Sequence, residues 1–143
     1  MNDRIHRVVI TGASSGIGLD MARAFLARGS RLVINGRDPE KLERVRRSLD
    51  PSQVVTVPGE IGDPATGPAL AAELARHKIR VNTVAPGIIR TPLNPDADSL
   101  AAIHPLGRVG EVRDTSEAAL YLATAGFVTG TTLAVDGGYS HGR

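Results

Sequence analysis

Three glycines, Gly12, Gly16 and Gly18, stand between an apolar run and a helical pattern near the start of the chain. The run RVVIT at 7–11 is rich in β-branched residues and predicts a strand, and the helical spacing of apolar residues in 16–28 predicts a helix. Glycines at such a junction allow a tight turn and let an anion approach the helix N-terminus, where the first N–H groups lack partners within the helix. The pattern therefore predicts a site for a pyrophosphate.

The turn reads Thr11-Gly12-x-x-x-Gly16-x-Gly18 and resembles the glycine turn of the short-chain dehydrogenase/reductase family. The stretch RVNTVAPGIIRTP, at 80–92, resembles the family's Pro-Gly motif after its sixth strand. HPLGRVGEV at 104–112 and FVTGTTLAVDGG at 127–138 resemble its C-terminal signature. The resemblance covers almost the whole chain in two blocks, 1–68 and 69–143.

The resemblance implies an oxidoreductase that uses a nicotinamide dinucleotide. Glu60 stands where the family usually has an aspartate beside the adenine ring, and the Pro-Gly motif and Thr91 match residues that contact the nicotinamide end in the family. The cofactor-binding residues that we expect from the matching motifs are Gly12, Ser14, Ser15, Gly16, Ile17, Gly18, Arg37, Glu60, Ile61, Pro86, Gly87 and Thr91.

The end of the second predicted strand bears on the choice of cofactor. An acidic residue there accepts hydrogen bonds from the ribose 2′-OH in NAD-binding relatives, whereas this chain has Gly36 followed by Arg37. An arginine can face a 2′-phosphate through a charge-assisted bidentate contact, although a solvated loop arginine is the alternative. The sequence therefore favours NADP(H) over NAD(H).

The segment that carries the chemistry in the family has no counterpart here. A tyrosine whose pKa is lowered by a lysine four residues later relays the proton there, because an unperturbed tyrosine titrates near pH 10. Four residues after Tyr121 stands Ala125, and four after Tyr139 stands Arg143, so no Tyr-x-x-x-Lys exists and we assign no catalytic residue.

The family's Asn-Asn-Ala-Gly strand and the strand with its serine are missing as well, which places a junction near 66–71, where DPATGP meets ALAAELARHK. The sequence leaves open a natural deletion, an engineered one, or a printed sequence that omits part of the molecule.

Strands and helices alternate along the rest of the chain, which is typical of an α/β fold with a parallel sheet. We expect a single Rossmann-like domain over 1–143, with a nucleotide-binding half at 1–68 and a C-terminal block at 69–143. Its reduced, five-stranded sheet has the order 3-2-1-4-5 and helices on both faces, and strand 79–85 lies beside strand 7–11. The further predicted strands are 31–35, 53–57 and 131–135, and the further helices are 39–49, 69–78 and 115–125.

Composition narrows the classes of function. The net charge is +2 and the basic residues are spread along the chain, so we expect no nucleic-acid partner. The chain has no cysteine, and no window is apolar enough to span a membrane, so we expect a soluble cytoplasmic protein. The four histidines, His6, His77, His104 and His141, have no metal-ligand spacing, so we expect scattered surface residues and no metal.

Three hypotheses for the function remain: an active oxidoreductase, a catalytically dead module that binds a dinucleotide or a partner, and a purely structural subunit. We also expect a homo-oligomer, because the short apolar strand TTLAV, at 131–135, would lie at a sheet edge.

Overall fold

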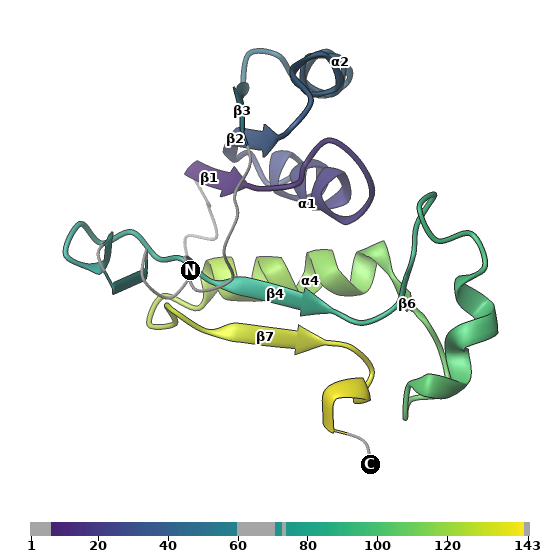
Figure 1. Cartoon of the computed structure of the whole chain (residues 1–143). Coiled ribbons are helices and arrows are strands. Elements are labelled where there is room, and N and C mark those ends of the chain that lie inside the picture. The colour runs from purple at the N-terminus through teal and green to yellow at the C-terminus, as the bar shows by residue number, and fades with distance from the viewer. Residues whose placement is uncertain (1–6, 60–70, 73, 142–143) are drawn as a thin grey trace. The chain divides into compact units, whose positions relative to one another are not determined.

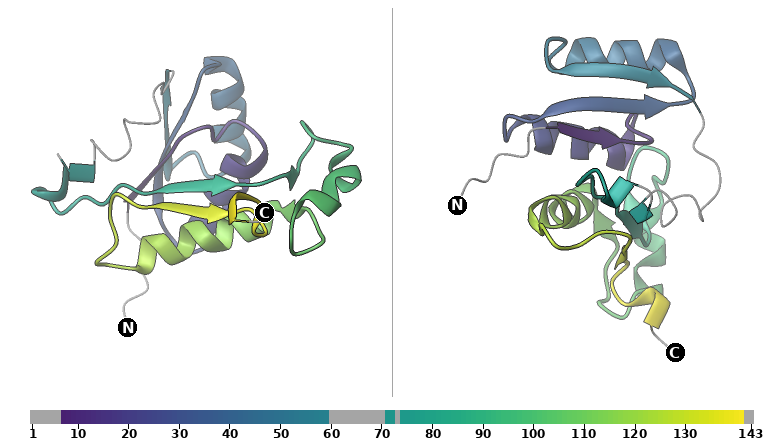
Figure 2. Two further views of the ribbon diagram at one scale, coloured as in Figure 1. Left: turned by 60° about the horizontal axis from the view of Figure 1, so that its bottom comes forward. Right: turned by 90° about the vertical axis from the view of Figure 1, so that its left-hand side faces the viewer.

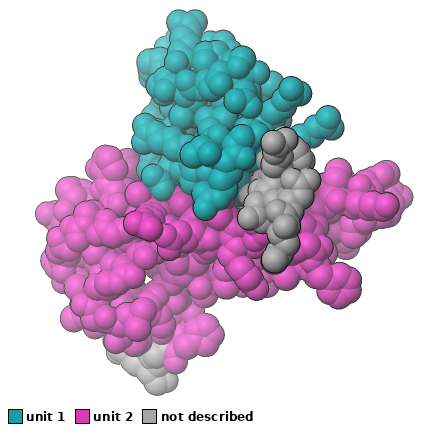
Figure 3. Space-filling view, turned by 180° about the vertical axis from the view of Figure 1, so that it is seen from behind, with its two compact units in different colours: residues 1–61 teal, residues 62–143 magenta. Residues whose placement is uncertain are grey.

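The computed structural model describes residues 7–59, 71–72 and 74–141. The chain divides into two compact units, residues 1–61 and residues 62–143, which Figure 3 distinguishes by colour. The prediction of one domain over the whole chain stays a prediction.

Unit 1 is a three-stranded parallel sheet with two helices. Its elements follow in the order β1 (Arg7–Ile10), α1 (Gly16–Leu26), β2 (Arg31–Gly36), α2 (Pro39–Ser48) and β3 (Val54–Pro58). The strands pair in the order β1-β2-β3 with all pairs parallel, as the alternation of elements predicts. Each predicted element of this half is present, with bounds that differ by one or two residues.

Both helices of unit 1 pack on the same face of this sheet (Figure 2). That face buries Leu32, Ile34 and Val54, which are at most 3% exposed, whereas Val9 and Val55 on the opposite face are 67% and 59% exposed. The expectation of helices on both faces is therefore not met by this three-stranded sheet. A bare apolar face is unusual for a parallel sheet, which is ordinarily covered on both sides.

Helix α2 begins where the sequence predicts it. The Asp38 side chain accepts a hydrogen bond from the Lys41 N–H at 3.0 Å, and Pro39 opens the helix, where a missing N–H costs nothing. Leu42 and Val45 are buried. The Glu43 carboxylate accepts charge-assisted hydrogen bonds from Arg46 and Arg47, and these bonds, chiefly the one from Arg46, lower its pKa to about 2.

Unit 2 is built around helix α4 (Val112–Thr124) and two parallel strands, β4 (Thr83–Pro86) and β7 (Thr132–Val135). Figure 1 shows α4 running along both strands. A second, two-residue pair joins β5 (Ile89–Arg90) to β6 (Gly110–Glu111). Two 3-10 helices, η1 (Ala97–Ile103) and η2 (Tyr139–His141), complete it.

The predicted single five-stranded sheet is wrong. β4 pairs with β7, and neither pairs with β1, so the described strands form separate sheets with the orders β1-β2-β3 and β4-β7. The partial orders within each half agree with 3-2-1 and 4-5, and only the join between them fails. Each of the four-residue strands β1 and β4 already has one parallel partner, β2 or β7, and no pattern within either strand specifies the further join between them.

The predicted strand 79–85 is shorter than expected because side chains in its first half bind the end of α4 and the turn before β7. Arg80 donates to the carbonyls of Leu122, Ala123, Ala125 and Val128, which lie at and beyond the end of α4. The Asn82 amide donates to Val128 O at 3.1 Å and accepts from Thr131 N. These two side chains fasten 79–82 to the turn before β7, so the strand begins only at Thr83. The predicted helix 69–78 is described in part: residues 71–72 and 74–75 are helical.

Candidate functional site

In the glycine turn between β1 and α1, the backbone comes close both to the start of α1 and to the end of β2. Gly12 and Gly16 have φ values of +65° and +52°, which side-chain-bearing residues rarely adopt. A Cβ on Gly18 would lie 2.5 Å from Gly12 O, so only glycine allows the helix to start against the turn. The Ala13 N–H donates to Asn35 O at 3.0 Å, which closes the turn onto β2.

The N-terminus of α1 suits an anion. Its N-cap residue, Ser15, makes no side-chain capping bond, and the first turn has no acidic residue. The first N–H groups and the positive end of the helix dipole therefore face no competing carboxylate from the first turn of the helix. The turn residues Ser14, Ile17 and Gly18 are half-buried. The donors at this helix start suit an anion such as a pyrophosphate, and a Cβ at Gly18 would push the turn away from them.

The carboxyl end of β2 lies against the turn. A Cβ on Gly36 would lie 3.4 Å from Ser14 Oγ, so Ser14 and the end of β2 are neighbours, and Arg37 follows as an exposed residue. The structure thus brings together the predicted site residues Gly12 to Gly18 and the start of the segment with Arg37. Glu60 and Ile61 lie outside the described residues.

The predicted residues of the Pro-Gly motif lie in unit 2. Pro86 ends β4, and Thr91 forms a bridge with Asn94, whose N–H donates to Thr91 O at 2.9 Å. A Cβ on Gly87 would lie 2.9 Å from Asp136 Cα and 2.9 Å from His104 Nε2. Packing against these two residues is by itself a sufficient reason for glycine at this position.

His104 is the residue that the sequence interpretation missed. It is 3% exposed, and its Nε2 accepts a hydrogen bond from the Ile88 N–H at 3.1 Å, directly after Gly87. The prediction of a surface residue is therefore wrong for His104. His77 and His141 are exposed, as predicted, and His6 lies outside the described residues. The hydrogen bond that His104 accepts joins it to a residue 16 positions away, and such a bond leaves no pattern in the sequence.

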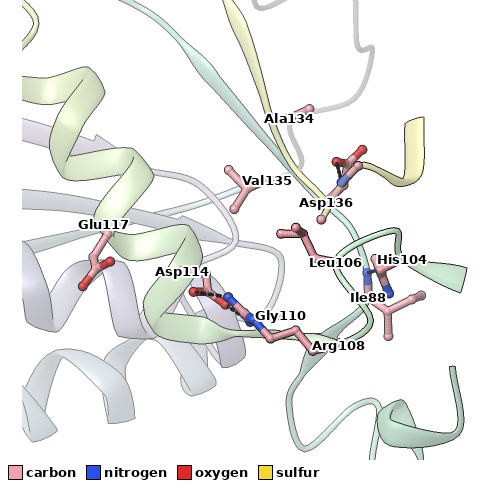
Figure 4. A pocket seen from close by; sticks show the side chains of 12 residues that line it. Ile88, His104, Leu106, Arg108, Gly110, Asp114, Glu117, Ala134, Val135 and Asp136 are labelled. Carbon is pink, nitrogen blue, oxygen red and sulfur yellow. Dashed lines mark hydrogen bonds and ion pairs between the residues drawn. The ribbon is translucent and has the colours of Figure 1, made fainter. Parts of the chain in front are cut away.

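A pocket of about 380 Å³ opens beside His104 in unit 2 (Figure 4). Its charged side chains are Arg108, Asp114, Glu117 and Asp136. Hydrogen bonds from the Arg108 side chain and, to a smaller extent, from the Glu111 N–H lower the pKa of Asp114. Hydrogen bonds from the Ser140 hydroxyl and N–H and, to a smaller extent, from the Gly138 N–H lower the pKa of Asp136. Both carboxylates are therefore ionised near neutral pH and are poor proton donors.

A substitute for the missing proton relay is not evident in the described residues. Tyr121 lies on α4 and is 59% exposed, and Ala125 is the C-cap of that helix with ψ +80°, outside the helical region. Tyr139 is in η2 and is 56% exposed. Among the described residues, no group of three or more His, Asp or Glu side chains could hold a metal ion. No helix in the described ranges is long and apolar enough to cross a membrane.

Family comparisons match the two halves of the chain separately. Residues 6–70 match the family described as short chain dehydrogenase, and residues 64–140 match the family described as Enoyl-(Acyl carrier protein) reductase. The two matches meet at residues 64–70, which overlaps the junction expected near 66–71. The expected junction itself lies almost wholly outside the described residues.

Curated relatives are longer than this chain. Carbonyl reductase family member 4 of Xenopus laevis is 47% identical over 72 residues, and the 3-oxoacyl-(acyl-carrier-protein) reductase of Bos taurus is 49% identical over 72 residues. In both cases the match covers 49% of this chain and 30% of the relative. The matched part of this chain therefore corresponds to less than a third of each relative.

Solved structures share the fold at low identity. A short chain dehydrogenase from Bacillus anthracis superposes with a TM-score of 0.75 at 23% identity, covering 99% of each chain. YwfH, described as an NADPH dependent reductase, superposes with a TM-score of 0.74 at 17% identity, covering 96% of this chain and 99% of that one. These likenesses show a shared fold, and the family matches to both halves show that the chain belongs to the short-chain dehydrogenase/reductase family.

Proposed function

We propose that this chain is a non-catalytic dinucleotide-binding member of its family, derived from an NAD(P)(H)-dependent oxidoreductase. The observation that carries the proposal is the glycine turn, where Gly18 lets the start of α1 lie closer to the Gly12 backbone than any residue with a Cβ could. The turn would hold the pyrophosphate through the backbone N–H groups at the start of α1. A bound nicotinamide dinucleotide supplies hydride chemistry in this family, and the proposal is that this chain keeps the binding and has lost the reaction.

The loss of the reaction follows from groups that act as a unit. The chain has no Tyr-x-x-x-Lys, and neither Tyr121 nor Tyr139 has a lysine four residues later. Without a nearby cation, a tyrosine titrates near pH 10 and exchanges protons poorly at neutral pH. The pocket beside His104 offers ionised carboxylates in place of a proton donor.

NADP(H) is the proposed ligand rather than NAD(H). Arg37 follows the end of β2, and Ser14 of the glycine turn lies against that end. An arginine at this place can bind a 2′-phosphate, whereas an acidic residue would favour a free 2′-OH. The curated relatives' substrates do not carry over to this chain, and a cytoplasmic location stays a prediction.

A glycine variant tests the proposal directly. Gly18→Ala should abolish NADPH binding, measured by the fluorescence anisotropy of the reduced nicotinamide, because its methyl group would overlap Gly12 O. Gly126→Ala is the matched control, since a Cβ there meets nothing within 4 Å. The original chain and the control should bind NADPH with equal affinity. A chain that binds no NADPH, or a Gly18→Ala variant that binds as well as the original, would refute the proposal.

The alternative is a module that binds a protein partner and no nucleotide. The observation in its favour is the bare valine face of unit 1, where Val9, Val55 and Val57 are 67%, 59% and 49% exposed. Contiguous apolar surface of this kind often marks an interaction site. In the same titration, this alternative predicts no response to NADPH in any variant.

A further inference from the structure

Asn35 is a buried polar residue near the end of β2 that the predicted site does not include. It is 8% exposed, in a strand whose neighbouring residue Ile34 is fully buried. Its side-chain amide donates two hydrogen bonds, to Val57 O at 2.9 Å and to Gly59 O at 3.1 Å. Its main-chain carbonyl accepts the third, from Ala13 N at 3.0 Å.

These bonds join three segments at the carboxyl edge of the sheet. The main chain of Asn35 holds the glycine turn after β1, and its side chain holds the last residues of β3 and the residue beyond them. The Gly59 N–H donates in turn to Gly36 O at 2.9 Å, so both the N–H and the C=O of Gly59 are bonded to the end of β2. Ligands of open parallel sheets bind at this edge.

The side-chain bonds reach beyond the sheet ladder. The register pairs Asn35 with Val57 and Gly36 with Pro58, where the ladder of β2 and β3 ends. A carboxamide can donate twice in fixed directions, which an apolar side chain of the same size cannot do. Removing the amide would take away both of these donors, so the end of β3 and Gly59 would lose their side-chain tie to the end of β2.

We propose that Asn35 is a positioning residue that sets the preference of this chain for the phosphorylated dinucleotide. It fixes the end of β2 against the glycine turn and β3, so that Arg37, two residues later, emerges at a defined place beside the turn. Asn35 acts through Arg37 and does not itself read the ribose. The inference rests on the proposed function, since it concerns selectivity at the same nucleotide site.

The test compares selectivity with affinity. Asn35→Leu keeps a similar volume without a donor, and Asn35→Ser keeps one shorter donor. Val33→Ala is the matched control, because Val33 lies on the same strand and the same face and loses only apolar contact. The readout is the ratio of the NADH and NADPH dissociation constants, because a merely structural defect would weaken both by the same factor.

The original chain should favour NADPH. Asn35→Leu should lower the ratio by about fivefold or more, the size expected for losing two modest hydrogen bonds. The ratio for Asn35→Ser should lie between those of the original chain and Asn35→Leu. Val33→Ala should lower thermal stability and leave the ratio unchanged. If Asn35→Leu does not fold, the comparison of Asn35→Ser with Val33→Ala decides.

A ratio that stays constant across the Asn35 variants would overturn the inference while leaving nucleotide binding intact. Equal affinity of the original chain for both dinucleotides would overturn it as well. Failure of the original chain to bind any dinucleotide would instead refute the proposed function itself, and the inference with it.

Discussion

At the scale of single residues, the architecture depends on three motif glycines and on two buried polar residues that bind distant segments of the chain. Gly12, Gly16 and Gly18 form a pattern because three glycines at fixed spacing serve one backbone geometry. Asn35 and His104 act through contacts with segments 22 and 16 residues away in sequence. Long-range contacts of this kind leave no local periodicity, so the sequence alone predicts a surface residue at His104, which is in fact buried.

Arg37 gives the first prediction at this scale. Arg37→Asp should reverse the preference from NADPH to NADH, because a carboxylate repels a 2′-phosphate and accepts hydrogen bonds from a free 2′-OH. Competition of the two dinucleotides, measured by fluorescence titration, reports the change. Arg31→Asp, with the same charge change at the other end of β2, should not alter the preference. Unchanged selectivity in Arg37→Asp would show that Arg37 does not read the ribose.

At the scale of elements, periodicity predicted unit 1 well and the Pro-Gly region poorly. The strands and helices from β1 to β3 follow alternation and capping signals, such as Asp38 and Pro39 before α2. The stretch 79–82 has the composition of a strand, yet Arg80 and Asn82 direct it to the turn before β7. The stretch after Pro86 contains β5 and η1, which the bonds of Arg90 to Asp98 and Glu111 hold in place.

Arg80 should be the largest polar contributor to the stability of unit 2. Its guanidinium donates to four carbonyls that α4 and the following turn leave without helical partners. Arg80→Ala should lower the free energy of unfolding by about 2–3 kcal/mol, measured by urea denaturation, since several charge-assisted bonds are lost together. Arg113→Ala removes only an exposed pair with Glu117 and should scarcely move the midpoint. Equal effects of the two substitutions would contradict this role.

Acid should destabilise the chain through carboxylates whose pKa is lowered in the fold. Besides Glu43, whose pKa is lowered to about 2 by Arg46 and Arg47, the pKa values of Asp50, Asp98, Asp114 and Asp136 are lowered. A lowered folded-state pKa gives stability that is present above the unfolded-state pKa, about 4, and is lost as pH falls through the folded value. The melting temperature should therefore drop between about pH 5 and pH 2. Glu43→Gln should make that drop shallower, and a melting temperature that stays level or rises over this range would count against the assignment.

At the scale of the whole molecule, the junction between the two halves of the chain is the part of the architecture that local sequence patterns do not predict. The two family matches meet at residues 64–70, and each curated relative is covered over 30% of its length. Strand orders within each half follow from local patterns. The join of β1 to β4 depends on pairing between two short edges, which no pattern within either strand specifies.

Self-association is a further prediction at this scale. β4 and β7 pair only with each other among the described strands, so each has one edge without a strand partner. We expect β7 to pair with a second copy, and light scattering at increasing concentration should show a species heavier than 15.0 kDa. Thr132→Lys places a charge on that strand and should favour the monomer, whereas Leu93→Lys adds the same charge to an exposed loop residue and should not. A monomer at every concentration would refute this expectation.

Our central proposal is that the chain binds NADP(H) but does not catalyse hydride transfer from it to a ketone. Equilibrium dialysis of the chain against NADPH and a panel of ketones tests both halves of the claim together, with a protein-free cell to measure spontaneous oxidation. The account predicts that NADPH accumulates on the protein side and is recovered fully reduced. The absence of accumulation would contradict the binding, and recovery of NADP⁺ together with an alcohol product would contradict the loss of catalysis.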